Sequence, residues 1–457
     1  MKKILHVGID DTDSLKGSCT THLATLILVE IFDRVDFLDF PNLIRLNPNI
    51  PYKTRGNGAV AIRIKGLQND LDFCRELILK KVETFSRVED ENTNPGVAFV
   101  EGKIPKEIFI HSQRAMWDVI SIEEAEQVNN LSNVDLYKYK NGRGIIGALG
   151  AIGNTLQNDF TYEHLSYRES AKFGTKRLIN EESVIKADKA TPLTFSNVDY
   201  EYSSIMITPR GADPVFAGIR GETVEQVRKA WSLIEPLEKI TMQMVFRTNQ
   251  HTNQHFVKKF KINQLKPHLS VIVDGAVSNK PKYIEGSHLI FSIYDNKGKI
   301  DCAAYEPTKR FRGQLSDLQI DDNVTVYGGV RPAGENHPQT INVERIKINS
   351  LVKIYSLENP FCDLCNIRLK SAGKDKGFKC PKCSKKYRNL QATKIENIRK
   401  LSLKEYLPPI VAHRHLTKPM EREGRNNIGQ ILNFTEVNAI LKELVEFSIK
   451  NSLKNER

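Results

Sequence analysis

The amino-acid sequence predicts a multidomain α+β protein. We expect an N-terminal α/β part, a compact α+β module, a small β-barrel of the OB-fold type, and a zinc ribbon followed by a C-terminal helix. The chain has 457 residues, enough for roughly three domains of ~150 residues each. Its apolar periodicity changes from mixed strand and helix patterns to an all-β pattern near residue 265. Two Cys-x-x-Cys pairs then follow within residues 362–383.

The composition excludes two broad classes of protein. Hydrophobic residues make up 40% and charged residues 27% of the chain, which is typical of a globular protein and not of a disordered one. The longest apolar stretch, residues 144–153, is about half as long as the roughly 20 residues that a membrane-spanning helix needs. Asp10 and Asp11 interrupt the N-terminal apolar run too early for a signal peptide. We therefore expect a soluble, cytoplasmic protein that does not associate with a membrane.

The positive charge is concentrated at one end of the chain. The formal net charge is +12, and residues 351–457 contribute +11 of it, with 22 basic and 11 acidic residues. A localised basic surface is expected of a nucleic-acid-binding protein. A solvated tail that aids solubility would have the same composition, so the charge alone leaves both interpretations open.

The first 160 residues predict two strands, two helices and a glycine-rich stretch. The expected strands are residues 4–9 and 58–64, the expected helices are residues 22–32 and 71–88, and the glycine-rich stretch is residues 141–153. We expect a threonine to cap the first helix. Strand, polar loop and helix in this order favour an α/β or α+β core.

The next hundred residues alternate between strand and helix patterns. Strands are expected over residues 204–208 and 242–247, and a turn over residues 209–214. Between the two strands, Thr223 and Gln226 form a capping-box sequence that opens a helix. This pattern is typical of a compact α+β module.

Residues 265–350 show only strand patterns. Five short strands separated by Gly, Asn and Asp turns are expected at residues 270–277, 288–294, 300–305, 323–330 and 340–348. They fit an OB-fold, which commonly binds nucleic acid, although another small barrel or sandwich would give the same pattern. Further along, residues 435–449 predict a helix with one apolar face.

Four of the seven cysteines have the spacing of a metal site. Cys362 and Cys365 form one pair, and Cys380 and Cys383 form the other. Four thiolates at this spacing suit tetrahedral Zn²⁺ and leave no open coordination position, so we expect a structural zinc ion.

An acidic cluster follows the first predicted strand. Asp10, Asp11 and Asp13 would repel one another unless a cation compensates their charge, and Mg²⁺ with a nucleotide phosphate is the usual one. An exposed acidic turn is the alternative. Thr20 and Thr21 begin the next helix, where free N–H groups attract anions. Either threonine could contact or accept a phosphoryl group, or could serve only as a helix cap.

Three other segments could carry function. Gly142, Arg143 and Gly144 resemble a phosphate-binding loop without matching a known fingerprint, and the glycines could instead permit close packing. A basic, aromatic-containing loop that could contact RNA comprises Arg45, Tyr52, Lys53 and Arg55. His413 and His415 lie in a basic run without acids, which favours RNA contact or a local structural role over metal binding.

Motifs along nearly the whole chain resemble one known family, the archaeal agmatidine synthetases, which make 2-agmatinylcytidine in isoleucine tRNA. The motifs are Gly8-Ile-Asp-Asp-Thr-Asp-Ser14, Cys19-Thr-Thr21, Pro51-Tyr-Lys-Thr-Arg-Gly56, Gly142-Arg-Gly-Ile-Ile-Gly-Ala-Leu149, Tyr167-Arg168, Phe195-Ser-Asn-Val-Asp199, Gly218-Ile-Arg-Gly-Glu222, Arg247-Thr-Asn-Gln250, Ser278-Asn-Lys-Pro-Lys-Tyr283, Ala303-Ala-Tyr-Glu-Pro-Thr308 and Ala412-His-Arg-His-Leu416. They occur in the family's order and precede or flank the cysteine cluster.

The resemblance implies an enzyme that uses ATP, Mg²⁺ and agmatine. It would attach agmatine to C2 of the wobble cytidine of the CAU-anticodon isoleucine tRNA, after phosphorylation of the C2 oxygen, while ATP is split to AMP and pyrophosphate. The family's phosphorylated threonine corresponds to Thr20, its signature aspartates to Asp10, Asp11 and Asp13, and its zinc ligands to the four clustered cysteines.

The resemblance also implies a domain order. We expect a threonine-autophosphorylating kinase-like catalytic domain (1–158), a ferredoxin-like domain (159–264), an OB-fold tRNA-binding domain (265–350), a zinc ribbon (351–395) and a basic C-terminal helical region (396–457). Two alternatives remain at this stage: a non-catalytic tRNA-binding or assembly protein, and another tRNA-modifying ATPase built from the same parts.

Overall fold

The first strand forms where the sequence predicts it and lies inside a large sheet. The computed structural model describes residues 1–53, 56–131, 133–335, 337–428 and 432–452. Strand β1 (Lys3–Asp10) pairs antiparallel with β4 (Gly58–Gly66) and with β5 (Gly96–Glu101). The sheet continues with β6 (Val134–Lys138) beside β5, and with β2 (Asp36–Phe37) and β3 (Asn42–Arg45) beside β4.

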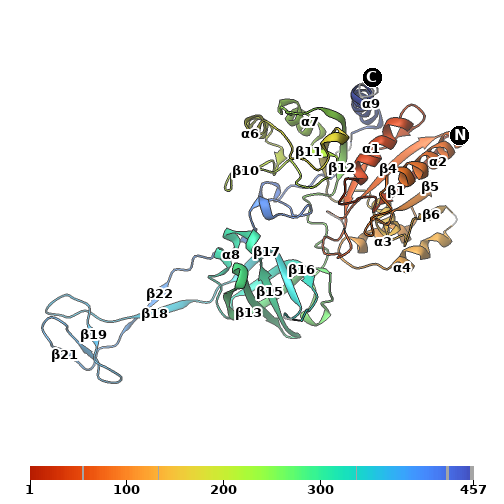
Figure 1. The fold of residues 1–457 in the computed structure, drawn as a ribbon. Helices are drawn as coiled ribbons and strands as arrows, with labels where there is room; N and C mark the ends of the chain where they lie inside the picture. Colours follow the sequence, from red (N-terminus) through yellow and green to blue (C-terminus); the bar gives the residue numbers. More distant parts are fainter. Residues whose placement is uncertain (54–55, 132, 336, 429–431, 453–457) are drawn as a thin grey trace.

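Helices cover both faces of this part of the sheet. One set comprises α1 (Thr20–Ile31) and α2 (Gln68–Phe85), and the other α3 (Lys106–Ala115), α4 (Ile122–Glu126) and α5 (Gly144–Gly153) (Figure 1). Alternate residues of β5 therefore enter two different apolar clusters. Val97 and Phe99 join the cluster that contains α1 and α2, whereas Ala98 and Val100 join the residues of α3 and α5.

The glycine-rich stretch is a helix, and its glycines permit close packing. A Cβ atom at Gly8 of β1 would overlap the Ala148 carbonyl of α5, and one at Gly96 of β5 would overlap the Ile145 backbone nitrogen. Helix α5 therefore lies directly on the two central strands. This geometry supports the packing interpretation of the glycines over a phosphate-binding loop.

The second module has the strand order of a ferredoxin-like fold. Its elements are β7 (Thr161–Arg168), α6 (Glu181–Ala190), β8 (Thr194–Phe195), β11 (Val215–Gly221), α7 (Val224–Leu233) and β12 (Ile240–Thr248). The strands are arranged β12-β7-β11-β8, and every adjacent pair is antiparallel. The predicted helix start is confirmed, because the Thr223 side chain accepts a hydrogen bond from the Gln226 N–H.

One expected strand of this region is shorter than predicted. Residues 204–208 form only β10 (Ser204–Ile205), which pairs with β9 (Val198–Asp199) outside the main sheet.

A parallel pairing joins the two modules into one sheet of ten strands. Strand β12 pairs with β3 through Arg247 opposite Asn42 and Thr248 opposite Leu43. The Arg247 side chain is 2% exposed and donates from Nη1 to Asp39 Oδ2 at 2.7 Å. Its Nη2 donates to the Leu156 carbonyl at 2.9 Å. The boundary between the two predicted domains is thus crossed by a continuous sheet.

The predicted five-stranded barrel is present and closed. Its strands are β13 (Ser270–Ile284), β14 (His288–Asp295), β15 (Gly298–Ala304), β16 (Asn323–Arg331) and β17 (Thr340–Ser350). They are arranged β15-β14-β13-β16-β17, and a parallel β15–β17 pairing closes the barrel. A short helix, α8 (Arg310–Leu315), follows β15, and β23 (Glu405–Tyr406) extends the sheet at β17.

The zinc ribbon lies at the tip of an arm that projects from the barrel (Figure 1). The arm is the antiparallel pair β18 (Ile354–Glu358) and β22 (Thr393–Asn397). The ribbon's own short strands are β19 (Lys370–Ser371), β20 (Phe378–Lys379) and β21 (Lys386–Tyr387). The ribbon is therefore held away from the body of the protein.

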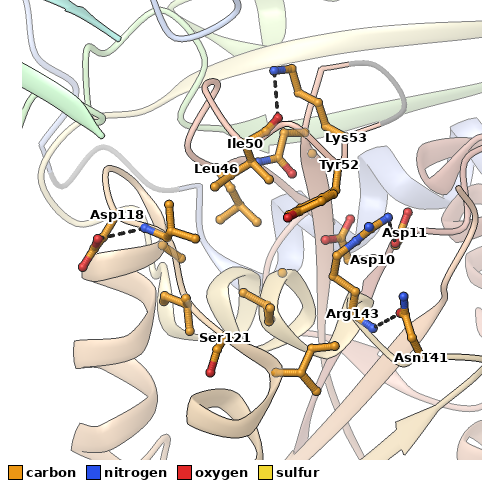
Figure 2. Close-up of a pocket in the computed structure, with 18 of the residues that line it drawn as sticks. Asp10, Asp11, Leu46, Ile50, Tyr52, Lys53, Asp118, Ser121, Asn141 and Arg143 are labelled. Carbon is orange, nitrogen blue, oxygen red and sulfur yellow. Dashed lines mark hydrogen bonds and ion pairs between the residues drawn. The ribbon is translucent and has the colours of Figure 1, made fainter. Parts of the chain in front are cut away.

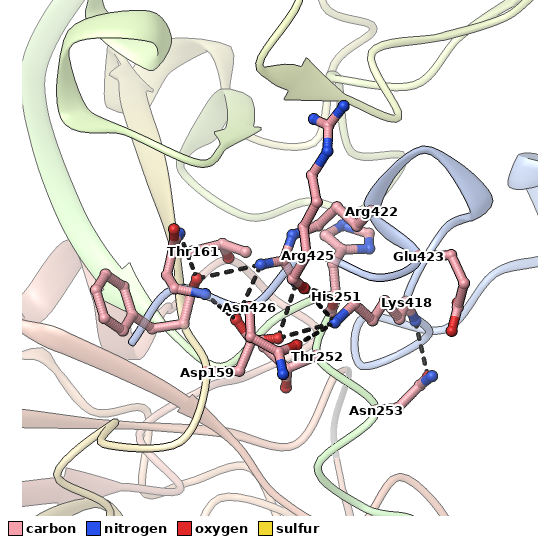
Figure 3. Close-up of polar contacts among 12 residues, drawn as sticks. Asp159, Thr161, His251, Thr252, Asn253, Lys418, Arg422, Glu423, Arg425 and Asn426 are labelled. Atoms are coloured by element: carbon pink, nitrogen blue, oxygen red, sulfur yellow. Dashed lines mark hydrogen bonds and ion pairs between the residues drawn. The ribbon is translucent and has the colours of Figure 1, made fainter. Parts of the chain in front are cut away.

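Residues 407–428, which we call the strap, return from the barrel to the N-terminal modules. The fully buried Arg422 binds Glu222 Oε1 from Nε at 2.6 Å and Asp159 Oδ1 from Nη2 at 3.0 Å. Lys418 adds a contact from Nζ to Asp159 Oδ2 at 3.2 Å (Figure 3). On the barrel side, Arg345 donates to the Lys418 carbonyl at 2.9 Å. The strap thus fixes the barrel to the ferredoxin-like module.

Helix α9 (Phe434–Ser452) lies on the N-terminal sheet and not beside the ribbon (Figure 1). Its buried residues Val437, Leu441 and Leu444 join the core shared by α1 and β12. The Asn438 side chain completes the contact by bonding both the N–H and the carbonyl of Phe37 in β2. Among the described helices, none has the length and apolar character needed to cross a bilayer.

We predict that Arg422→Ala lowers the free energy of unfolding by about 3–5 kcal/mol, because it leaves the buried Glu222 carboxylate without its cation and leaves Asp159 with Lys418 alone. Thermal and denaturant unfolding measure the change. The matched control is Arg228→Ala, which breaks the partly exposed pair with Glu443 and should cost less than about 1 kcal/mol. Equal losses in the two variants would contradict the assignment of Arg422 as the anchor of the strap.

Candidate active site

A cavity of about 440 Å³ lies where the acidic cluster meets the N-terminus of α5 (Figure 2). Its lining includes Asp10, Asp11, Asp13, Arg143 and residues of the loop 46–58. We call it the acidic cavity. It brings together the predicted carboxylates and one of the three predicted cofactor-binding residues, Arg143.

Two of the aspartates are partly buried and have raised pKa values. Burial, together with the neighbouring Asp11 carboxylate, raises the pKa of Asp10 to about 8. Burial also raises the pKa of Asp11 to about 6, although the Arg143 guanidinium opposes the rise. Arg143 Nη2 donates to Asp11 Oδ2 at 3.0 Å. A Cβ atom at residue 147 would overlap Asp10 Oδ2, so Gly147 makes the room for this carboxylate.

Asp13 is hydrogen-bonded to the start of α1. Its Oδ1 accepts from the Thr20 N–H at 2.6 Å and from Thr20 Oγ1 at 2.9 Å. Thr20 is 2% exposed. The expectation that a threonine caps this helix is wrong: the N-cap residue is Cys19, and the Asp13 carboxylate, from the preceding loop, satisfies the Thr20 N–H.

A second cavity of about 330 Å³ lies on the other side of Asp13 and Gly58, which line both cavities. We call it the arginine cavity. Its lining includes residues from both modules and from the strap: Thr20, Arg45, Glu163, Arg220 and His415. Of the two cavities, Thr20 lines this one, which contains two guanidinium groups, and its hydrogen bond to Asp13 connects it with the acidic cavity.

The polar groups of the arginine cavity form a connected network. Arg220 Nε donates to Glu163 Oε1 at 2.8 Å, and Gln250 Nε2 donates to Glu163 Oε2. Gln250 Oε1 lies 3.1 Å from His415 Nδ1. The Arg45 guanidinium, together with burial, holds the pKa of His415 well below its ordinary value, so this imidazole is neutral.

Sequence reasoning missed the roles of Glu163 and Arg220. Arg220 lies in a motif that carries the family resemblance, but nothing local to the sequence shows that it faces Thr20. Arg45 was expected in an RNA-contacting loop and instead ends strand β3. Arg55, from the same expected loop, lies outside the described residues.

The other residues of that loop lie near the acidic cavity. Tyr52 and Lys53 both line it, and the Arg143 guanidinium lies 5.2 Å from the centre of the Tyr52 ring. Gly142 and Gly144 are not among the lining residues. The Gly144 N–H donates to the Asn94 carbonyl at 3.0 Å, so it is already engaged.

The four cysteines form a site that fits zinc. One ligand atom from each of Cys362, Cys365, Cys380 and Cys383 lies within 4.8 Å of the others, and among the described residues no other group of three or more His, Cys, Asp or Glu side chains converges in this way. This confirms the predicted cluster. The three aspartates do not converge on a single point, so a cation here would need phosphate or water ligands as well.

The two histidines of the strap have local partners. His413 Nε2 lies 2.9 Å from the Pro408 carbonyl, and His415 contacts Gln250. These contacts support a local structural role over a metal site.

The fold and the cavities define a class of protein: a two-module α/β body with a buried acidic site, joined to a closed five-stranded barrel and a zinc ribbon. Family models match three parts of the chain, the TiaS TCKD domain over residues 6–141, the TiaS FLD domain over residues 142–255, and the TiaS C-terminal zinc ribbon domain over residues 359–401. The chain belongs to the TiaS family.

Curated relatives cover nearly the whole chain. Proteins of Methanosarcina acetivorans and Methanocaldococcus jannaschii, both named as the isoleucine-tRNA 2-agmatinylcytidine synthetase TiaS, are 41% and 42% identical to it. Each alignment covers 92% of this chain and 98% of the relative.

Solved structures of the family have the same fold. Apo TiaS, an isoleucine-tRNA agmatidine synthetase, aligns with a TM-score of 0.83 at 36% identity, over 93% of this chain and 98% of that one. The complex of TiaS with its isoleucine tRNA and ATP aligns with a TM-score of 0.82 at 36% identity, and the complex with the tRNA, AMPCPP and agmatine with 0.79 at 34%. Both cover 94% of this chain and 100% of the other.

We predict that burial of Asp10 makes stability fall as pH rises in the absence of divalent metal. An acid whose pKa rises from 3.8 to about 8 on folding binds its proton more tightly in the folded state, so stability is lost between about pH 4 and pH 8. In EDTA, the melting temperature of Asp10→Asn should rise relative to that of the parent protein as the pH increases from about 5 to about 8. Asp36→Asn, on the surface beside Lys2, is the control. If the difference in melting temperature between Asp10→Asn and the parent protein did not change with pH, the proposed burial of the Asp10 carboxylate would be contradicted.

Proposed function

We propose that this chain is an ATP-dependent tRNA-modifying synthetase. It joins agmatine to C2 of the wobble cytidine of the isoleucine tRNA with a CAU anticodon, and the product is agmatidine. Relatives with about 40% identity carry the name of this activity, and TiaS structures with an isoleucine tRNA, ATP, AMPCPP and agmatine share the fold.

One observation carries the proposal for this chain: Thr20 lines the arginine cavity, and its hydroxyl donates to Asp13, a carboxylate that lines both cavities. Asp13 is placed to accept the proton that Thr20 Oγ1 loses when the oxygen takes a phosphoryl group. Phosphoryl transfer needs positioning and charge neutralisation more than covalent assistance. A buried hydroxyl 2.9 Å from a carboxylate oxygen meets the positioning requirement.

The acidic cavity is the proposed site for ATP and Mg²⁺. Mg²⁺ is usually held by one or two carboxylates together with phosphate oxygens and water, so Asp10 with Asp11 or Asp13 would suffice. When bound, Mg²⁺ would neutralise charge on the phosphates. The raised pKa values of Asp10 and Asp11 indicate carboxylates whose burial is only partly offset, by the Arg143 guanidinium that pairs with Asp11. Arg143 would contribute a second positive charge at the nucleotide.

The modification itself replaces an oxygen with an amine. Phosphorylation of the cytidine C2 oxygen converts a poor leaving group into phosphate. The agmatine amine then forms a C2–N bond while the C2–O bond breaks and phosphate leaves. AMP and pyrophosphate, which we also expect, contain all three phosphorus atoms of one ATP, so the phosphoryl group that activates C2 comes from a second ATP molecule. The cytosine must leave the anticodon stack to reach the cavity.

The barrel, the arm and the ribbon are the proposed tRNA-binding surfaces. Residues 351–401 contain 13 basic and 4 acidic residues, so most of the chain's excess positive charge lies on the projecting arm and ribbon. A charged element held away from the body can follow the RNA backbone at a distance from the modified base.

We predict that Asp10→Asn lowers agmatidine formation by about 10²-fold or more, because it removes a carboxylate that would hold Mg²⁺ against the phosphates. Incubation with ATP, labelled agmatine and tRNA transcript, followed by nucleoside analysis, measures the product. Asp36→Asn should retain parental activity. Parental turnover by Asp10→Asn would place the active site elsewhere.

Thr20→Ala should abolish ATP-dependent phosphorylation of the chain. The adjacent Thr21→Ala is the matched comparison. The Thr21 hydroxyl contacts Cys19 Sγ at 3.1 Å, whereas the Thr20 hydroxyl donates to Asp13. Phosphate that persists in Thr20→Ala and disappears in Thr21→Ala would transfer the role to Thr21.

We predict that tRNA affinity depends on salt and that the ribbon contributes to this dependence. The double variant Lys374→Ala/Lys376→Ala removes two exposed charges. It should reduce the slope of the logarithm of the tRNA association constant, plotted against the logarithm of the salt concentration, by about 1 to 2. Filter binding at several salt concentrations measures the slope, with Lys442→Ala on α9 as control. An unchanged slope in the ribbon variant would make the basic arm a solubility feature.

A further inference from the structure

The arginine cavity contains a guanidinium group that lacks an acceptor. Arg45 Nε is buried without a hydrogen-bond partner, and among the described residues no oxygen accepts a bond from either Nη atom. The backbone of Arg45 is well anchored, since Asn249 bonds both its N–H, at 2.7 Å, and its carbonyl, at 2.9 Å. Burial lowers the pKa of the guanidinium, and the nearby Glu163 and Asp13 carboxylates oppose this fall only in part. The strand is fixed, whereas the charge at the end of the side chain is not satisfied.

Two glycines leave the space that this guanidinium occupies. A Cβ atom at Gly56 would lie 2.7 Å from Arg45 Nη1, and one at Gly58 would lie 2.8 Å from the same atom. The guanidinium therefore packs directly against backbone at the wall of the cavity. Any larger residue at either position would displace it.

The acids of the cavity already have partners. Glu163 accepts from Arg220 and Gln250, and Asp13 accepts twice from Thr20. Within the described part of the chain, Arg220 donates to Glu163 from Nε alone, so its two Nη groups remain for another acceptor. His415 is neutral, because its pKa is held low. The unsatisfied groups of this cavity are thus donors, and they suit an anion.

We propose that Arg45 and Arg220 bind a phosphoryl group in the arginine cavity, either carried by Thr20 or present as free phosphate. Planar guanidinium groups bind phosphate oxygens in pairs and hold them more strongly than neutral donors do. The N-terminus of α1, a helix of 12 residues, adds the positive end of the helix dipole on the same side, since Thr20 and Thr21 line the cavity. The part of this inference that concerns Thr20 rests on the proposed function, and the part that concerns free phosphate does not.

Phosphorylation of the full-length chain tests the first source. After incubation with ATP and Mg²⁺, peptide mass spectrometry measures the occupancy of phosphate on Thr20. We expect at least a tenfold lower occupancy in Arg45→Gln at equal times, and an intermediate value in Arg45→Lys, which keeps the charge. Arg75→Gln is the matched control, because Arg75 pairs with Glu101 and Asp135 outside both cavities. Its occupancy should equal that of the parent.

Melting temperatures test the second source. Inorganic phosphate, compared with sodium chloride at equal ionic strength, should raise the melting temperature of Thr20→Ala, and adding Arg45→Gln to that variant should abolish the rise. Without phosphate, Arg45→Gln should melt at or above the parent temperature, since it removes a buried charge that has no partner. A role of Arg45 in folding alone would instead lower the melting temperature.

The outcomes distinguish phosphate carried by Thr20 from free phosphate, and they distinguish failure of this inference from failure of the proposed function. Loss of phosphorylation alone assigns the phosphoryl group to Thr20, loss of the phosphate-dependent stabilisation alone assigns free phosphate, and loss of both assigns both. Parental values for Arg45→Gln in both assays would overturn the inference, as would a melting temperature well below that of the parent. If the parent protein never carries phosphate on Thr20, that part of the proposed function fails, and the phosphate-dependent melting still decides whether the cavity binds the anion.

Discussion

The parallel pairing of β3 with β12 is the constraint on which the candidate site depends. It makes one sheet from two modules, and it places strands of both beside a single cavity. Arg45 and Leu43 come from the first module, while Glu163 and Arg220 come from the second. Without this seam Thr20 would face solvent or its own module only. The seam is also where Arg247 is buried against Asp39 and the carbonyls of residues 155 and 156.

Two buried arginines fix the positions of the modules relative to one another. Arg247 fixes the seam and Arg422 fixes the strap, and each has carboxylate partners that would be costly to leave alone. Such pairs add little net stability compared with apolar packing, but they are sensitive to geometry, because a shift of an ångström leaves a buried charge unpaired. The strap connects the barrel to the cavities, since Arg345 bonds its backbone and His415 lines the arginine cavity. The barrel and the two N-terminal modules are therefore held in one arrangement.

In contrast to these paired arginines, several charged side chains near Thr20 are in unfavourable surroundings. Asp10 and Asp11 are buried acids with raised pKa values, and Arg45 is a buried cation without an acceptor among the described residues. Asp11 also adopts a positive φ of 55°, which is uncommon outside glycine. Unfavourable local features of this kind cluster at functional sites, where a ligand relieves them. Here Asp10 and Asp11 line the acidic cavity, and Arg45 lines the neighbouring cavity that contains Thr20.

Much of the fold could be predicted because its signals are local. The five barrel strands, the first helices and the cysteine cluster each follow from a periodicity or a spacing that one segment contains. Helix α5 could not be identified as a helix because glycine is a poor helix former. Its glycines are explained only by the strands against which they pack.

The acidic cavity could be anticipated, whereas the arginine cavity could not. Asp10, Asp11 and Asp13 lie within four residues of one another, so the sequence alone indicates that their carboxylates form one cluster. Glu163 and Arg220 are separated from Thr20 by well over a hundred residues, and only the seam brings them together. The capping of α1 was misassigned for a similar reason, since the carboxylate that replaces the threonine cap comes from the loop before it.

The most direct test of this account is hydrogen exchange of the full-length chain with and without ATP and Mg²⁺. If a phosphoryl group passes from ATP to Thr20, amides of residues 10–21 and of residues 215–221 should gain protection together, because both segments line the arginine cavity. Protection confined to residues 10–21 and the loop before β4 would contradict the claim that the second module takes part in the site.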